Sequence, residues 1–307
     1  MRTAPIIATA RGTRSEAFGP AEWGLLAAIA AMWGSSFLFI AIGLEAFEPG
    51  LIALLRLAFG AAALSLVPRA RRRRVDREDR ARVALLGVIW MAIPLTLFPV
   101  AQQWIDSSRA GMINGAMPLF SALFAAVLLR SAPGLRQAAG LAIGFGGIVL
   151  VSVAPAEAGS AILLGIGLAM LATMLYGLAA NLTVPLQQKY GALPVVWRAQ
   201  LVAVVLLVPY GLISIPGSSF RLSSLLAVAV LGLFATGLAF VLMATLVGRA
   251  GATRGAVAIY FIPVVATVLG VTLRGETVGP LGIAGIALII AGAWLTSRRE
   301  RLHAGPA

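Results

Sequence analysis

Long apolar runs separated by short polar segments dominate this chain. Reading the runs between charged residues, proline and glycine predicts ten helical spans, at residues 23–43, 49–67, 83–104, 108–129, 135–154, 161–184, 194–215, 222–247, 252–273 and 280–297. The runs approach the ~20 residues that an α-helix needs to cross a bilayer. They lack the alternation of apolar and polar residues that membrane β-strands have. The pattern therefore predicts an all-α integral membrane protein with ten transmembrane helices.

The composition fits a membrane protein and argues against an enzyme. Hydrophobic residues make up 60% of the 307 residues, charged residues 11%, and the mean hydropathy is +0.96; a soluble domain is about half apolar and roughly a quarter charged. The chain has no cysteine, its single histidine is His303, and none of its eleven acidic residues falls in the middle of a predicted span. We therefore expect a transporter with no catalytic residue, no metal site and no cofactor.

The basic residues gather on one side of the predicted membrane. Counted loop by loop, 19 of the 24 Lys and Arg residues fall on the side that carries both tails, and only Arg109, Arg221 and Arg274 fall on the other. Cytoplasmic loops carry such an excess, so we expect the tails 1–22 and 298–307 to be cytoplasmic. The arginine-rich segment 68–82 is then a topology anchor near anionic lipid headgroups, and we expect no nucleic-acid partner.

The chain resembles itself at a constant offset of 145 residues. The matched pairs are Gly87 and Gly232, Arg109 and Arg254, Pro118 and Pro263, Gly134 and Gly279, Gly140 and Gly285, Gly147 and Gly292, and Ser152 and Ser297, with Trp33 and Tyr176 matching at an offset of 143. This predicts two five-helix repeats, at 23–157 and 158–297. Because five is odd, the second repeat is inserted upside down, which is the architecture of many secondary transporters. The pair Gly140 and Gly144, with Gly147 beyond it, predicts a face for close helix packing.

Several short motifs resemble one family. The segment Trp33–Phe37, the proline and arginine of Pro49 to Arg56, the mid-span prolines Pro118 and Pro263, and the Gly275-Glu276 turn resemble motifs of the EamA-like, ten-helix branch of the drug/metabolite transporter superfamily. Within that branch the chain is most similar to the YddG-type exporters of amino acids and related metabolites. One departure stands out: Ser131 occupies the place in the first repeat that corresponds to Glu276.

Arg56 is the first candidate for the transport site. It lies seven residues into the second predicted span, roughly 10 Å below the surface. One interpretation is that it lines a cavity and binds a substrate carboxylate with its guanidinium. The other is that it hydrogen-bonds carbonyls at a helix break or reaches Glu45 or Glu48.

Uncharged polar residues within the spans supply further candidates. Asn114 and Asn181 each need a partner or a cavity, because an unsatisfied amide in lipid is costly. Asn114 lies four residues before Pro118, so it also qualifies to repair the backbone break there. Ser36 belongs to the same class on the first span.

Aromatic residues in the middle of the spans complete the predicted site. Trp33, Trp90, Tyr176 and Tyr260 lie away from the interfaces where Trp and Tyr usually gather. They are predicted to line a cavity, with ordinary packing as the alternative. Trp33 and Tyr176 occupy equivalent repeat positions, so we expect them to face each other across the repeat axis.

These observations predict a facilitative carrier that exports amino acids or related carboxylate-bearing metabolites by alternating access. The absence of acidic residues and histidine within the spans argues against proton coupling, although Glu45 or Glu276 remains able to titrate from the outer surface. The alternatives are a proton- or sodium-coupled drug or metabolite exporter, and a channel. We expect a monomer or weak homodimer in the bacterial inner membrane, whose partners are a small-molecule substrate and the lipid bilayer.

Overall fold

The computed structural model describes residue 7 and residues 9–10, 20–130, 134–152, 159–250 and 256–297. The predicted tail 298–307, most of the tail 1–22, and Ser131 lie outside the described residues. The described part of the chain folds into helices and contains no strand.

The helices follow the predicted apolar runs. Through the first repeat they are α1 (Pro20–Leu44), α2 (Pro49–Ser65), α3 (Pro68–Arg72), η1 (Arg77–Asp79), α4 (Arg80–Leu86), η2 (Gly87–Ala92), α5 (Ile93–Ala101), α6 (Ser107–Asn114), α7 (Met117–Leu128) and α8 (Leu135–Ser152). Through the second they are α9 (Ser160–Tyr190), α10 (Ala192–Ile213), α11 (Leu222–Val230), η3 (Leu231–Leu238), α12 (Ala239–Ala250), η4 (Ala256–Phe261), α14 (Ile262–Arg274) and α15 (Pro280–Ser297). Proline at the first or second position begins several of them, where its missing N–H costs nothing.

Helix length and composition suit a membrane. Within the described ranges, six helices are long and apolar enough to cross one: Trp23–Leu44, Arg77–Ala101, Ser107–Leu128, Ser160–Tyr190, Ala192–Ile213 and Leu222–Arg249. Shorter apolar helices cover Pro49–Ser65, Ala138–Val151, Ala258–Arg274 and Pro280–Gly292. The prediction of an all-helical membrane protein is therefore confirmed, and ten crossings stay a prediction.

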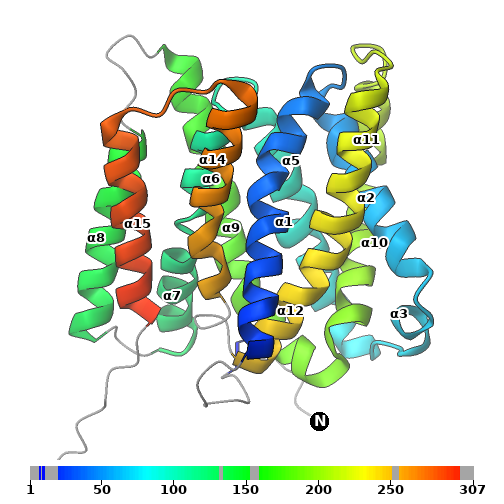
Figure 1. Cartoon of the computed structure of the whole chain (residues 1–307). Coiled ribbons are helices and arrows are strands. Elements are labelled where there is room, and N and C mark those ends of the chain that lie inside the picture. Colours follow the sequence, from blue (N-terminus) through cyan, green and yellow to red (C-terminus); the bar gives the residue numbers. More distant parts are fainter. Residues whose placement is uncertain are drawn as a thin grey trace, which may run out of the picture.

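Figure 1 shows the helices as one bundle with two distinct ends. We call the lower end, where α1 begins and α3 lies, the arginine-rich end. The upper end, which we call the opposite end, carries the α1–α2, α5–α6, α10–α11 and α14–α15 connections.

Helix irregularities occur at matching places in the two repeats. The chain widens into π-helix at Gly87–Ala92 and at Leu231–Leu238. The fourth predicted span breaks between α6 and α7, and in the described part of the ninth the 3-10 helix η4 precedes α14. Pro118 and Pro263 both occupy the second position of the helix that follows. Such interruptions within membrane helices gather at functional sites.

The helix contacts between the repeats also correspond. A Cβ on Gly147 would lie 2.7 Å from the carbonyl oxygen of Gly285, and one on Gly292 would lie 2.5 Å from that of Gly140. These two contacts are equivalent under the 145-residue offset. They let α8 and α15 touch backbone to backbone at one edge of the bundle (Figure 1). The predicted glycine face is thus used within the chain.

Candidate functional site

A cavity lies in the middle of the bundle, between helices of both repeats. Its lining consists of Trp33, Ser36, Phe37, Ile40, Arg56, Trp90, Phe98, Asn114, Met117, Tyr176, Ala180, Thr183, Phe240, Met243, Val247 and Ile259. Six of the eight predicted site residues are among them: Trp33, Ser36, Arg56, Trp90, Asn114 and Tyr176.

Arg56 brings a positive charge into this cavity. The residue is 3% exposed, and its Nε donates a hydrogen bond of 3.0 Å to the hydroxyl of Thr236. That hydroxyl donates in turn to the carbonyl oxygen of Leu231, five residues earlier on the π-helix η3, at 3.0 Å. Among the described residues, no protein group accepts a hydrogen bond from the two terminal nitrogens of Arg56. Glu45, one of its proposed partners, instead pairs with Arg221 and Arg274.

The π-helix η3 also positions two other polar side chains. Trp33 donates its indole N–H to the carbonyl oxygen of Ala235 at 2.9 Å, and Gln200 donates to the carbonyl oxygen of Thr236 at 2.5 Å. A π-turn leaves carbonyl groups out of the regular helix ladder, so they accept from neighbouring helices. Thr236 was not predicted as a site residue, because a threonine in an apolar run is usually bonded within its own helix.

An aromatic cluster forms the wall of the cavity. Phe240 on α12 lies at its centre, with ring centroids 5.2 Å from Trp33, 5.1 Å from Trp90 and 6.4 Å from Tyr176. Phe98 stacks on Tyr176 at 6.0 Å. Phe240 therefore lies against both Trp33 and Tyr176. Sequence reasoning missed Phe240 and Phe98, because nothing in the sequence distinguishes them from other phenylalanines of the spans.

Two neutral polar groups in the lining have no hydrogen-bond partner among the described residues. Asn114 ends α6 beside the helix break, and its buried Oδ1 accepts no hydrogen bond from the described residues. No hydrogen bond between described residues links its side chain to the break before Pro118. Thr183 is 1% exposed and its hydroxyl is likewise unbonded. Other hydroxyls of this kind, such as that of Thr173, donate to the carbonyl four residues earlier.

The remaining two predicted site residues lie outside the lining. Asn181 is 1% exposed, and its amide donates to the carbonyl oxygens of Ser121 at 2.9 Å and Gly177 at 3.0 Å, which joins α9 to α7. Its Oδ1 lies 3.5 Å from the hydroxyl of Thr9. Tyr260 is buried on η4 next to the lining residue Ile259. Asn181 thus has the partners that a buried amide needs.

The size and charge of the cavity limit what it holds. Its volume is about 40 Å³, which at ~10–15 Å³ per enclosed water is room for about three waters. A metabolite therefore enters only when the lining moves apart. The described lining contains one cation, Arg56, and no Asp, Glu or His.

At the opposite end, Glu276 forms a contact between the two repeats, which we call the Glu276 clasp. The carboxylate of Glu276 accepts hydrogen bonds from the backbone N–H groups of Ser107 and Ser108, at 3.0 and 2.8 Å, and from both serine hydroxyls. It thereby caps the N-terminus of α6, where a negative charge is favoured. Gly275, in the left-handed conformation with φ 65°, ends α14 and turns the chain so that Glu276 faces α6. Burial acts to raise the pKa of Glu276, but the hydrogen bonds from Ser107 and Ser108 outweigh it and the pKa is lowered.

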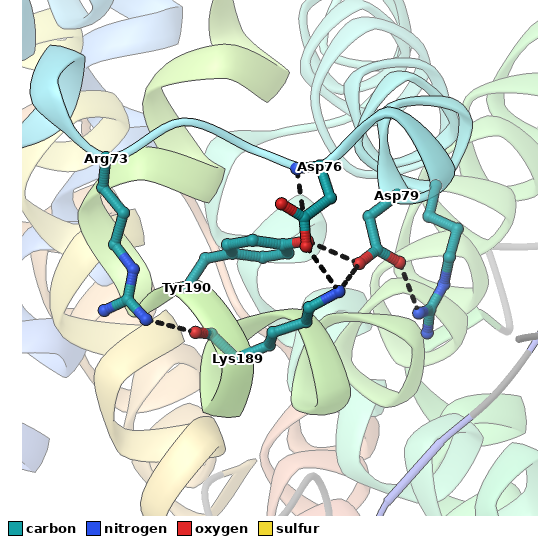
Figure 2. A network of polar contacts seen from close by, with 6 residues as sticks. Arg73, Asp76, Asp79, Lys189 and Tyr190 are labelled. Atoms are coloured by element: carbon teal, nitrogen blue, oxygen red, sulfur yellow. Dashed lines mark hydrogen bonds and ion pairs between the residues drawn. The ribbon is translucent and has the colours of Figure 1, made fainter. Parts of the chain in front are cut away.

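At the arginine-rich end, a network of charged residues connects the end of α9 with the segment between α3 and α4 (Figure 2). Lys189 at the end of α9 lies 2.9 Å from Asp76 and 2.8 Å from Asp79, and Arg82 lies 2.9 Å from Asp79. The Tyr190 hydroxyl lies between the two carboxylates, 2.8 Å from Asp76 and 2.7 Å from Asp79. Hydrogen bonds from Lys189 and Tyr190 hold the pKa of Asp76 below its ordinary value. In this network the carboxylates of Asp76 and Asp79 are paired with Lys189 and Arg82.

Comparison with known proteins identifies the kind of protein. The EamA-like transporter family matches residues 22–153 and again residues 163–298. A "Probable terminal-alkyne amino-acid exporter" of Streptantibioticus cattleyicolor is 29% identical over 288 residues, which cover 91% of this chain and 94% of that protein. An "Uncharacterized transporter" of Archaeoglobus fulgidus is 25% identical, covering 91% and 99% of the two chains. The "Uncharacterized inner membrane transporter YedA" of Escherichia coli is 26% identical, covering 87% and 88%.

A solved structure shares the fold. A protein described only as "Crystal structure of protein" superposes with a TM-score of 0.68 at 19% identity, covering 90% of this chain and 96% of that one.

Proposed function

The chain belongs to the EamA-like transporter family, and from this premise we propose that it is a facilitative carrier that exports amino acids or related carboxylate-bearing metabolites through the central cavity by alternating access. It is a membrane transporter and not an enzyme. The substrate, the direction and the absence of ion coupling are the proposed part.

The observation that carries the proposal is the charge of Arg56. A buried cation with no acidic partner is costly within a membrane, and such residues usually bind a substrate or an ion. The two terminal nitrogens have no described partner, and together they can bind a carboxylate in a bidentate contact. Thr236 fixes the side chain through Nε, so the other two nitrogens stay available. A carboxylate is therefore the group that completes this site.

The rest of the cavity suits an apolar or aromatic side chain. Tyr176 and Thr183 are seven residues apart on α9, about 10 Å along the helix, so the lining extends from the aromatic cluster toward the arginine-rich end. Met243 and Val247 line the lower part. Asn114 and Thr183 supply neutral oxygens for a substrate ammonium or hydroxyl. The relative named as an exporter of an amino acid with a terminal alkyne agrees with this class of substrate.

The architecture that we propose is ten helices in two inverted five-helix repeats, 23–157 and 158–297, with both tails cytoplasmic in a bacterial inner membrane. The paired π-helices, the paired helix breaks and the reciprocal glycine contacts of α8 and α15 support the repeat. The uneven distribution of arginine supports the orientation. Because the chain has no cysteine, single cysteines at Gly159 and Arg72 are clean probes. They should react with an impermeant reagent from opposite sides, and reaction from the same side overturns the topology.

The cavity supports transport down the substrate gradient rather than proton exchange. Its described lining offers no carboxylate or histidine that a proton and a substrate would share. Glu276 and Glu45, the two carboxylates able to reach inward, are held at the opposite end by Ser107 and Ser108 and by Arg221 and Arg274.

The test is counterflow with purified protein in liposomes. Preloaded unlabelled amino acid should drive uptake of the same labelled amino acid, and the corresponding amine without the carboxylate should neither compete nor exchange. An imposed pH gradient should leave the flux unchanged. Equal exchange of the amine overturns the carboxylate assignment, accumulation driven by the pH gradient indicates a coupled exporter, and flux that neither saturates nor exchanges indicates a channel.

A further inference from the structure

A second pocket, of about 440 Å³, lies at the arginine-rich end, away from the central cavity. It is enclosed by α3, the turn between α9 and α10, and one face of α12. Arg69, Arg72 and Arg73 line it from α3 and the end of that helix, and Leu193, Pro194 and Val241 line it from α10 and α12. The pocket therefore combines cationic and apolar lining residues.

Among the described residues, no carboxylate pairs with the arginines of this pocket. The nearby carboxylates of Asp76 and Asp79 are already paired with Lys189 and Arg82. Arg73 donates only to the backbone carbonyl of Lys189, at 2.5 Å (Figure 2). Arg69 and Arg72 have no acidic partner among the described residues. Three like charges in one pocket repel each other, so an anion between them is favoured.

The backbone around the pocket is fixed and adds to its positive field. Arg198 donates to the carbonyl oxygens of Ala70 at 3.1 Å and Pro194 at 3.0 Å, which holds α3 against the start of α10. The 22-residue helix α10 begins after Gly191 without a side-chain cap. The partial positive charge of this helix end adds to that of the three arginines.

We propose that this pocket binds the phosphate headgroup of an anionic phospholipid, with the start of its acyl region against Leu193, Pro194 and Val241. A soluble anion would use the arginines but gain nothing from the apolar residues. Basic pockets between membrane helices on the cytoplasmic side suit such headgroups, and the orientation proposed above puts this end on that side. The bound lipid joins α3, α10 and α12.

The arginine-rich segment supplies a matched control for the test. Arg71 and Arg74 are exposed, belong to the same segment and do not line the pocket. The variants Arg69→Gln/Arg72→Gln and Arg71→Gln/Arg74→Gln remove the same charge. Lipid affinity of the full chain in detergent is measured by native mass spectrometry with phosphatidylglycerol and with phosphatidylcholine. The unmodified chain should prefer phosphatidylglycerol, and the pocket variant should bind it about tenfold more weakly, against about twofold for the control.

The two measurements distinguish binding in the pocket from non-specific attraction of lipid to the basic segment. They also distinguish a lipid ligand from a soluble phosphate. Equal losses in the two variants overturn the proposal, because the segment then acts only through its total charge. A second measurement compares the thermal stabilisation by short-chain phosphatidylglycerol with that by glycerol 3-phosphate at the same concentration. Stabilisation by the lipid alone is expected, and equal stabilisation by glycerol 3-phosphate assigns the pocket to a soluble phosphate and overturns the lipid assignment.

Discussion

Two regions of this protein bury charge, and they differ in whether that charge has a partner. In the central cavity, Arg56 faces no described acidic group and donates one hydrogen bond to Thr236. At the arginine-rich end, Asp79 is 4% exposed and lies within 2.9 Å of both Arg82 and Lys189. Removing one member of a satisfied pair leaves a buried charge uncompensated, whereas removing an unpaired charge removes an unfavourable term. The first region should therefore matter for transport and the second for stability.

The largest expected effect is that of Arg56→Gln on transport. Losing the carboxylate contact should lower the transport rate at limiting substrate about a hundredfold, which corresponds to a hydrogen-bonded charge contact of ~3 kcal/mol. The melting temperature should stay unchanged or rise, because the guanidinium has no counter-charge in the described part of the chain. Counterflow in liposomes and tryptophan-monitored melting measure the two quantities. A large fall in melting temperature with unchanged transport per folded molecule would make Arg56 a structural residue.

Asp79→Asn should have the reverse effect. Arg82 and Lys189 lose their shared partner, so the free energy of unfolding should fall by about 2 kcal/mol, while transport by the folded fraction stays near that of the unmodified protein. Asp76→Asn is the matched control: Asp76 is 59% exposed, and its loss should matter less. Equal effects on melting would show that burial does not distinguish the two carboxylates.

Asn181 and Asn114 allow the same comparison, between a buried group with a partner and one without, to be made with uncharged side chains. Asn181→Ala breaks the bonds to Ser121 and Gly177 and should destabilise the protein by about 1–2 kcal/mol. Asn114→Ala removes a group without a protein partner and should lower transport about tenfold with little change in melting. The transport rate and the melting temperature of both variants test this prediction. A loss of transport confined to Asn181→Ala would show that Asn181 belongs to the binding site.

The smallest expected effect is the pH dependence of the Glu276 clasp. Because the pKa of Glu276 is lowered from its ordinary value of 4.5, the clasp stabilises the protein above about pH 4.5 and loses that contribution as the pH falls through the lowered value. Burial and then the charge of Glu276 raise the pKa of the neighbouring Asp106, and the charge of Arg109 opposes this. When Asp106 takes up a proton, the repulsion between the two carboxylates is relieved.

The difference in melting temperature between the unmodified protein and Glu276→Gln should accordingly be constant between about pH 5 and pH 8 and shrink below about pH 4.5. Gly270→Ala should disturb the same hydrogen bonds by a different means. A Cβ there would lie 2.2 Å from Oε2 of Glu276 and from the hydroxyl of Ser108. A difference that disappears near neutral pH would contradict the lowered pKa.

The sequence by itself determined the class of the protein and its helices. Run length and the near absence of charge within the runs predict membrane helices, because both follow from the thickness and low polarity of a bilayer. The predicted span 194–215 is the continuous helix Ala192–Ile213, although Arg198, Gln200 and Pro209 lie within it. The most informative site residues were also visible in the sequence. Arg56 and Asn114 are polar residues within apolar helices. Burying a polar group there costs free energy, so such residues usually have a function.

Only the tertiary structure decided which side of each helix faces the cavity. Asn114 and Asn181 have the same side chain at similar depth, yet one lines the cavity and the other joins α9 to α7. Thr183 and Phe240 line it although their neighbours in sequence give no sign of this. The rotation of a helix about its axis depends on contacts with distant segments, such as Gly87 against α10 and Gly232 against α2. Those contacts are set by packing among all the helices, which the pattern along any one span does not contain.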